Sequence, residues 1–149
     1  MQLLQVKSFF ILEVTLCVLW HVEVDGRPSI QVAKGCYRDR SGSGRAMPDL
    51  LASYRKNGLD WSNLEETVIQ KCRKEAEERG FKCFGIQFYG ECWSGLNACD
   101  TYYKYGPSDE CFCTSDVSLN STFPKYQPNC LGPVGGRWAN FVYELREPL

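Results

Sequence analysis

The placement of cysteine is the sequence feature that most constrains what this chain can fold into. Eight of the nine cysteines follow residue 35, and the ninth, Cys17, lies in an apolar N-terminal stretch. An even set of cysteines behind an export signal is typical of a disulfide framework formed in an oxidising compartment. We therefore predict that the eight pair with one another as disulfides: Cys36, Cys72, Cys83, Cys92, Cys99, Cys111, Cys113 and Cys130.

The first 26 residues have the pattern of a signal peptide. Lys7 supplies the positive charge, and a mostly apolar run continues to Trp20 before His21, Glu23 and Asp25. A membrane-spanning helix needs roughly twenty mostly apolar residues, and this run is nearer about thirteen, so cleavage near Gly26 is favoured over anchoring. We predict a signal peptide over 1–26, a lead-in over 27–34 and one cysteine-rich domain over 35–146. The predicted localisation is secreted and extracellular.

Loss of the leader would also remove the only histidine, His21, and leave 149 − 26 = 123 residues, enough for one domain. Without an imidazole, and with its cysteines oxidised, the mature chain lacks the usual general base of hydrolases and the nitrogen ligand of most zinc sites. We expect no catalytic residue, no metal and no cofactor. A glycosidase that uses two carboxylates stays open as the alternative, because it needs no histidine.

The net charge of the mature chain limits the classes of partner that we predict. The leader takes one of the 17 basic and three of the 18 acidic residues, so the mature chain carries 16 − 15 = +1. This balance gives no electrostatic footprint for nucleic acid or for an anionic membrane. We predict neither nucleic-acid binding nor membrane insertion.

Hydrophobic periodicity predicts an α+β fold, with one helix packed on a short antiparallel sheet and long irregular loops. Ser62 and Glu65 match a capping box at the start of the helix, and Gly80 ends it. Its apolar stripe is expected to face the sheet: Leu64, Val68, Ile69, Cys72 and Ala76. The predicted strands are an edge strand over 30–37, a central strand over 81–89, its hairpin partner over 90–95 and a closing strand over 138–145.

Alternation within the central strand predicts which side chains share a face. Phe84, Ile86 and Phe88 should point to one side, and Cys83, Gln87 and Tyr89 to the other. We expect Trp61 and Trp138 to lie in the core. The Asp39 to Gly44 segment resembles the start of a calcium loop, but its twelfth position is Leu50 instead of glutamate, so a turn is favoured.

The order of these segments resembles the WSC module (WSC/PAN-like). The matching stretches are Gly35-Cys36-Tyr37, Gly80-Phe81-Lys82-Cys83-Phe84-Gly85, Gly90-Glu91-Cys92-Trp93-Ser94-Gly95, Tyr105-Gly106-Pro107-Ser108 and Asn140-Phe141-Val142-Tyr143. The similarity covers about residues 35–146 and is closer to a WSC-like domain of secreted and matrix proteins of marine invertebrates. It implies a small α+β fold and a carbohydrate-binding role. The chain departs from the pattern at Trp93, where WSC modules usually have a cysteine, and at Gly135-Gly136, which no cysteine precedes.

Eight cysteines allow about a hundred pairings, and the sequence alone does not choose among them. Cys111 and Cys113 should not pair with each other, because a one-residue loop strains a disulfide. As a working hypothesis we take Cys36–Cys111, Cys72–Cys92, Cys83–Cys99 and Cys113–Cys130.

The leading functional hypothesis is glycan binding by aromatic residues near the turns, because sugar rings stack on aromatic planes while polar neighbours bind the hydroxyls. The candidate ligand-binding residues are Gln87, Tyr89, Glu91, Trp93, Tyr102, Tyr103 and Tyr105. For each aromatic residue, core packing is the competing interpretation. The predicted partners are glycans or extracellular glycoproteins.

The alternative function is a structural component of an extracellular or biomineral matrix, or a disulfide-stabilised venom- or mucus-type protein, without a sugar pocket. Asn120-Ser121-Thr122 is a glycosylation sequon, so we also predict a glycoprotein.

Overall fold

The computed structural model describes residues 28–56, 59–114 and 124–148. The predicted signal peptide and the Asn120 sequon lie outside the described residues. The strands are β1 (Ile30–Arg38), β2 (Asp49–Ser53), β3 (Cys83–Gln87), β4 (Glu91–Ser94), β5 (Cys111–Phe112), β6 (Val134–Gly135) and β7 (Ala139–Arg146). The helical elements are η1 (Gly42–Gly44), η2 (Glu65–Ile69), α1 (Gln70–Glu78) and α2 (Ala98–Thr101). The α+β class predicted from the sequence is thus confirmed.

Five strands form one antiparallel sheet in the order β1-β7-β3-β4-β2. As predicted, β1 is an edge strand, β3 is central and β4 is its hairpin partner. Strand β3 is buried along its whole length, because side chains cover both of its faces. Strands β5 and β6 form a separate two-stranded sheet beside it.

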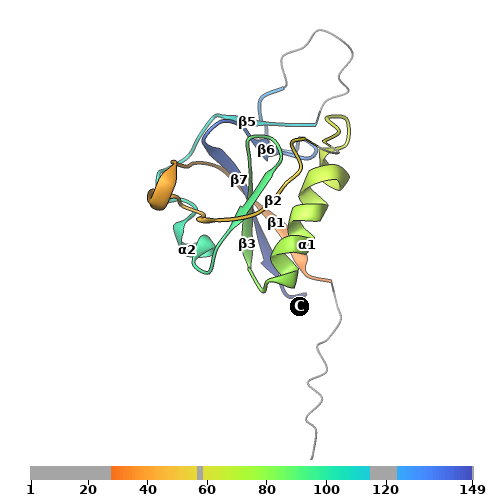
Figure 1. The fold of residues 1–149 in the computed structure, drawn as a ribbon. Coiled ribbons are helices and arrows are strands. Elements are labelled where there is room, and N and C mark those ends of the chain that lie inside the picture. The colour runs from red at the N-terminus through yellow and green to blue at the C-terminus, as the bar shows by residue number, and fades with distance from the viewer. Residues whose placement is uncertain (1–27, 57–58, 115–123, 149) are drawn as a thin grey trace, which may run out of the picture.

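Helix α1 covers one face of the sheet, while α2 and the η1 turn lie on the other side (Figure 1). The predicted apolar stripe of the helix is fully buried. It packs against Phe84, Ile86 and Phe141 of the sheet. The opposite face carries a smaller core, made by Met47, Cys83, Trp93, Ala98 and Val142.

The start of the helix differs from the prediction. The Ser62 hydroxyl donates to the Asp60 carboxylate at 2.7 Å, and the Asn63 side chain accepts the Glu66 amide at 3.3 Å, so the Ser62–Glu65 capping box does not form. The first turn, η2, is a π-helix. Gly80 ends the helix as predicted: its φ of 72° lets the amide of Phe81 reach the Ala76 carbonyl at 2.9 Å.

Four disulfides join the elements in the pairing taken as the working hypothesis: Cys36–Cys111, Cys72–Cys92, Cys83–Cys99 and Cys113–Cys130. Cys72–Cys92 ties α1 to β4 through the larger core, and Cys83–Cys99 ties β3 to α2 on the opposite face. Within the described part of the chain, no helix has the length and apolar character needed to cross a membrane. Both findings are compatible with an extracellular protein.

Candidate functional site

Three aromatic residues adopt a backbone conformation that bulky side chains rarely occupy. The φ angles are 46° at Phe88, 68° at Tyr89 and 54° at Trp138. Phe88 and Tyr89 directly follow β3, and Trp138 directly precedes β7. Such left-handed residues cost free energy, persist only where the surroundings enforce them, and cluster at functional sites.

The turn before β7 supplies the hydrogen bonds that enforce this conformation. The amides of Phe88 and Tyr89 donate to the carbonyls of Gly136 and Gly135 at 3.0 and 2.8 Å. A Cβ on Gly135 would overlap the carbonyl oxygen of Ala139. Glycine is therefore required where the two backbone segments meet.

These dihedral angles reverse the predicted sides of two residues. Because the alternation stops after Gln87, Tyr89 packs toward the helix-side core, with its ring centroid 5.1 Å from that of Trp61 and 5.5 Å from that of Phe112. Phe88 lies against Trp138, at 5.1 Å between centroids. The prediction that Phe88 shares a face with Phe84 and Ile86 is wrong.

Trp138 is also not a core residue, contrary to the prediction. It is 36% exposed, and its ring meets the Phe88 ring edge to face. Trp61 is partly buried and packs against the main core, as expected.

Arg45, which precedes β2, connects Trp138 to Trp93. Its guanidinium carbon lies 3.5 Å from the centroid of the Trp93 ring and 5.7 Å from that of Trp138. Such stacking is favourable because the ring face is electron-rich and a guanidinium is weakly hydrated. Trp93 is only 9% exposed, so it forms the floor beneath Arg45.

Asp39, whose side chain is fully buried, fixes Arg45 from below. Its carboxylate accepts from Arg45 at 3.0 Å, from the Ala46 amide at 2.8 Å and from the Asn140 side chain at 3.0 Å. The Gln87 side-chain oxygen accepts a second bond from the same Arg45 nitrogen at 2.9 Å. Asp39 and Gln87 therefore position the guanidinium. This is the physical role of the segment whose sequence resembled a calcium loop.

A second arginine closes the arrangement. Arg55 lies 5.3 Å from the centroid of the Phe88 ring and forms a 3.1 Å salt bridge with Glu91. The other oxygen of Glu91 accepts from the indole nitrogen of Trp93 at 3.1 Å. The contacts thus run in a closed circuit, which we call the tryptophan–arginine ring: Arg45, Trp138, Phe88, Arg55, Glu91 and Trp93.

The structure separates the seven candidate residues predicted from the sequence. Glu91 and Trp93 belong to the ring, and Gln87 supports it from a fully buried position. Tyr89 packs elsewhere. The sequence analysis missed Arg45, Arg55, Phe88 and Trp138; the signal that could have found Trp138 is the Gly135-Gly136 pair before it.

The three remaining tyrosines are not members of the ring. Tyr102 packs against the smaller core that contains Trp93, and it meets the rings of Tyr37, at 4.7 Å, and Tyr103, at 5.0 Å between centroids, edge to face. Tyr103 is 55% exposed. Tyr105 donates a hydrogen bond to the Gly44 carbonyl and lies under the Arg40 guanidinium at 4.3 Å.

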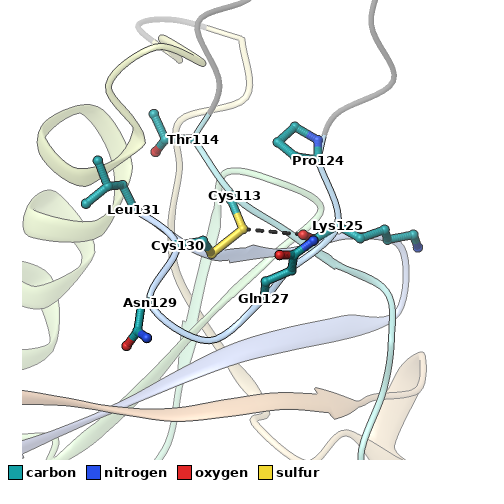
Figure 2. Close-up of a pocket in the computed structure, with 8 residues that line it drawn as sticks. All are labelled: Cys113, Thr114, Pro124, Lys125, Gln127, Asn129, Cys130 and Leu131. Atoms are coloured by element: carbon teal, nitrogen blue, oxygen red, sulfur yellow. Dashed lines mark hydrogen bonds between the residues drawn. A yellow bond between two sulfur atoms is a disulfide. The ribbon is translucent and has the colours of Figure 1, made fainter.

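Four pockets in the described part of the chain have volumes of 260–440 Å³, and none of these four is lined by the ring or by the seven predicted residues. The 360 Å³ pocket in Figure 2 surrounds the Cys113–Cys130 disulfide and includes Thr114, Lys125 and Leu131. There the Cys113 sulfur lies 3.6 Å from the Lys125 carbonyl oxygen. The pocket lies between the loops that this disulfide joins.

The largest pKa shifts belong to contacts outside the ring. Hydrogen bonds from Arg146 and Lys34 lower the pKa of Glu144 to about 2. Burial raises the pKa of Tyr54 to about 12 and that of Tyr143 well above its usual value. These shifts come from ion pairing and burial within the fold.

Comparison with family models, with curated proteins and with solved structures finds no match for this chain. The resemblance to the WSC module therefore stays a prediction, and the functional argument rests on the geometry of the ring.

Proposed function

We propose that this protein is a secreted, non-catalytic module that binds carbohydrate at the tryptophan–arginine ring. The observation that carries the proposal is Trp138, a large aromatic residue that is 36% exposed and held in a left-handed backbone conformation. A domain this size gains stability by burying its aromatic residues. An exposed and conformationally costly tryptophan is better explained by a ligand than by folding.

The side chains of the tryptophan–arginine ring have the chemistry needed to bind a sugar. Aromatic faces stack on the C–H faces of sugar rings, and hydrogen-bonding groups are supplied by Arg45, which contacts Trp138, and by Arg55, which contacts Phe88. Of its members, Trp138 and Arg55 are exposed at the surface of the molecule. Exposed side chains of this kind suit a segment of an extended polysaccharide better than a small free sugar.

The test is retention of the oxidised protein on a panel of insoluble or immobilised polysaccharides: cellulose, chitin, β-1,3-glucan, alginate and heparin. We expect Trp138→Ala to lose retention. Tyr103→Ala is the matched control, because Tyr103 is more exposed than Trp138 but lies outside the ring. It should bind as the wild type does.

If the folded wild type is retained on none of these polymers, the carbohydrate proposal is wrong, and the alternative of a structural matrix component takes its place. If Tyr103→Ala abolishes retention and Trp138→Ala does not, the site lies at the tyrosines instead.

A further inference from the structure

The tryptophan–arginine ring has more positive than negative charge around it. Arg45 and Arg55 belong to it, and Arg137 immediately precedes Trp138 and is exposed. The carboxylates in direct contact with these arginines are those of Asp39 and Glu91. Three arginines therefore stand against two acids, in a protein whose overall charge is close to zero.

The two carboxylates are already used inside the protein. Asp39 is fully buried and accepts hydrogen bonds from Arg45, from two backbone amides and from Asn140. Glu91 accepts from Arg55 with one oxygen and from Trp93 with the other. Neither acid is placed to repel an incoming anion strongly, since each is neutralised by its own arginine.

The arginines, in contrast, keep donors in reserve. Arg45 uses one nitrogen, Nη1, for both Asp39 and Gln87, and Arg55 uses its Nη1 for Glu91. Within residues 28–56, 59–114 and 124–148, the Nε and Nη2 groups of both arginines have no hydrogen-bond partner, and neither does the side chain of Arg137. A guanidinium can donate two parallel hydrogen bonds to a carboxylate or sulfate, and stacking on Trp93 already fixes the plane of Arg45.

From these observations we infer that the ligand is an acidic glycan, whose sulfate or carboxylate groups bind Arg45, Arg55 and Arg137 while a sugar ring stacks on Trp138. This inference rests on the carbohydrate-binding function proposed above and adds the charge class of the sugar. The exposed indole of Trp138 favours an acidic glycan over a polyanion without sugar rings, because only a sugar ring can stack on the indole. The near-neutral charge of the whole protein argues against general binding to polyanions.

The experiment compares four soluble ligands by titration at low and high salt: heparin and dextran sulfate (sulfated), alginate (uronate), and unmodified dextran (neutral). Poly-L-glutamate serves as an acidic polymer without sugar rings. The test variant is Arg55→Gln with Arg137→Gln, because both residues are exposed and the buried Asp39–Arg45 pair stays intact. Lys74→Gln with Arg79→Gln is the control matched for charge, because it also removes two exposed positive charges; like Arg55, Lys74 and Arg79 each pair with one glutamate.

We expect at least one acidic glycan to bind and dextran and poly-L-glutamate not to bind. Binding should weaken as salt is raised, because exposed charges are screened. The double variant of Arg55 and Arg137 should bind about tenfold more weakly, since two exposed ionic contacts are lost, while the Lys74 and Arg79 control should bind as the wild type does. Preference for heparin and dextran sulfate over alginate would assign the arginines to sulfate, and the reverse order to carboxylate.

Binding of neutral polysaccharides with equal or greater affinity, unaffected by the double variant, would overturn the acidic-glycan inference while leaving the carbohydrate function in place. Equal binding to poly-L-glutamate would also overturn it, because the sugar ring would then contribute nothing. Binding to no polysaccharide would reject both proposals.

Discussion

At position 138 we expect a glycine variant to be more stable than an alanine variant, which is the reverse of the usual order. In most strand and helix positions glycine is less stable than alanine by roughly 0.5–1 kcal/mol, because glycine loses more backbone freedom on folding. At Trp138 the φ angle is 54°, which costs a residue with a Cβ about 1–2 kcal/mol and glycine almost nothing. Trp138→Gly should therefore be more stable than Trp138→Ala by about 0.5–1 kcal/mol.

The comparison isolates the backbone, because both variants lose the same ring contact with Phe88, worth about 0.5–1.5 kcal/mol. Urea unfolding with the disulfides intact gives the two free energies of unfolding. Ser53 in β2 is the control position: it is exposed and is not among the residues with positive φ, so Ser53→Ala should be more stable than Ser53→Gly.

If Trp138→Ala is as stable as Trp138→Gly, or more so, the left-handed conformation carries no cost, and the argument that a ligand explains it fails. If the order is as expected and both variants lose retention on polysaccharide, the conformation is maintained for binding at the expense of stability.

Three further predictions concern the fold. Replacing Cys36 and Cys111 by alanine should lower the free energy of unfolding by about 4 kcal/mol, because the two residues are 75 apart in sequence and the bridge restricts a long loop of the unfolded chain; a loss below about 1 kcal/mol in denaturant unfolding would contradict this. Gly135→Ala should abolish the near-UV circular dichroism of the native state, since the added Cβ overlaps a fixed backbone oxygen, whereas Gly44→Ala, whose added Cβ meets only the Tyr105 hydroxyl, at 3.3 Å, should fold. Glu144 has a pKa of about 2 in the folded protein against about 4.5 when unfolded, so its stabilising contribution is complete above about pH 4.5 and is lost as the pH falls toward 2. Because the pair is on the surface, that contribution is at most about 1 kcal/mol, and Glu144→Gln should flatten the acid limb of the stability curve; an unchanged slope in urea titrations at several pH values would reject it.

The sequence predicted the elements that depend on local periodicity. The buried stripe from Leu64 to Ala76 and the termination at Gly80 are set by helical spacing and by glycine's freedom at positive φ, and both are confirmed. The α+β class and the order of edge, central and closing strands followed from alternation and turn residues.

The tryptophan–arginine ring could be predicted only in part, because it depends on long-range backbone contacts. Glu91 and Trp93 were identified from their place beside a turn. Phe88 and Trp138 were misplaced, since their orientation is set by hydrogen bonds between the residues after β3 and Gly135-Gly136, nearly fifty positions away in sequence. Arg45 belongs to the tryptophan–arginine ring only because Asp39 is buried next to it, and no local sequence pattern shows that Asp39 is buried.

The antiparallel pairing of β1 with β7 has a practical consequence for handling the molecule. Ile30 is paired with Arg146, so the chain enters and leaves the sheet at neighbouring points. Trp138 precedes the opposite end of β7, about 25 Å away at the usual rise of a strand. A biotin tag or a fused second protein attached just before Ile30 or just after Arg146 would therefore lie far from Trp138, and protein tethered there to a sensor chip can serve every binding measurement described above.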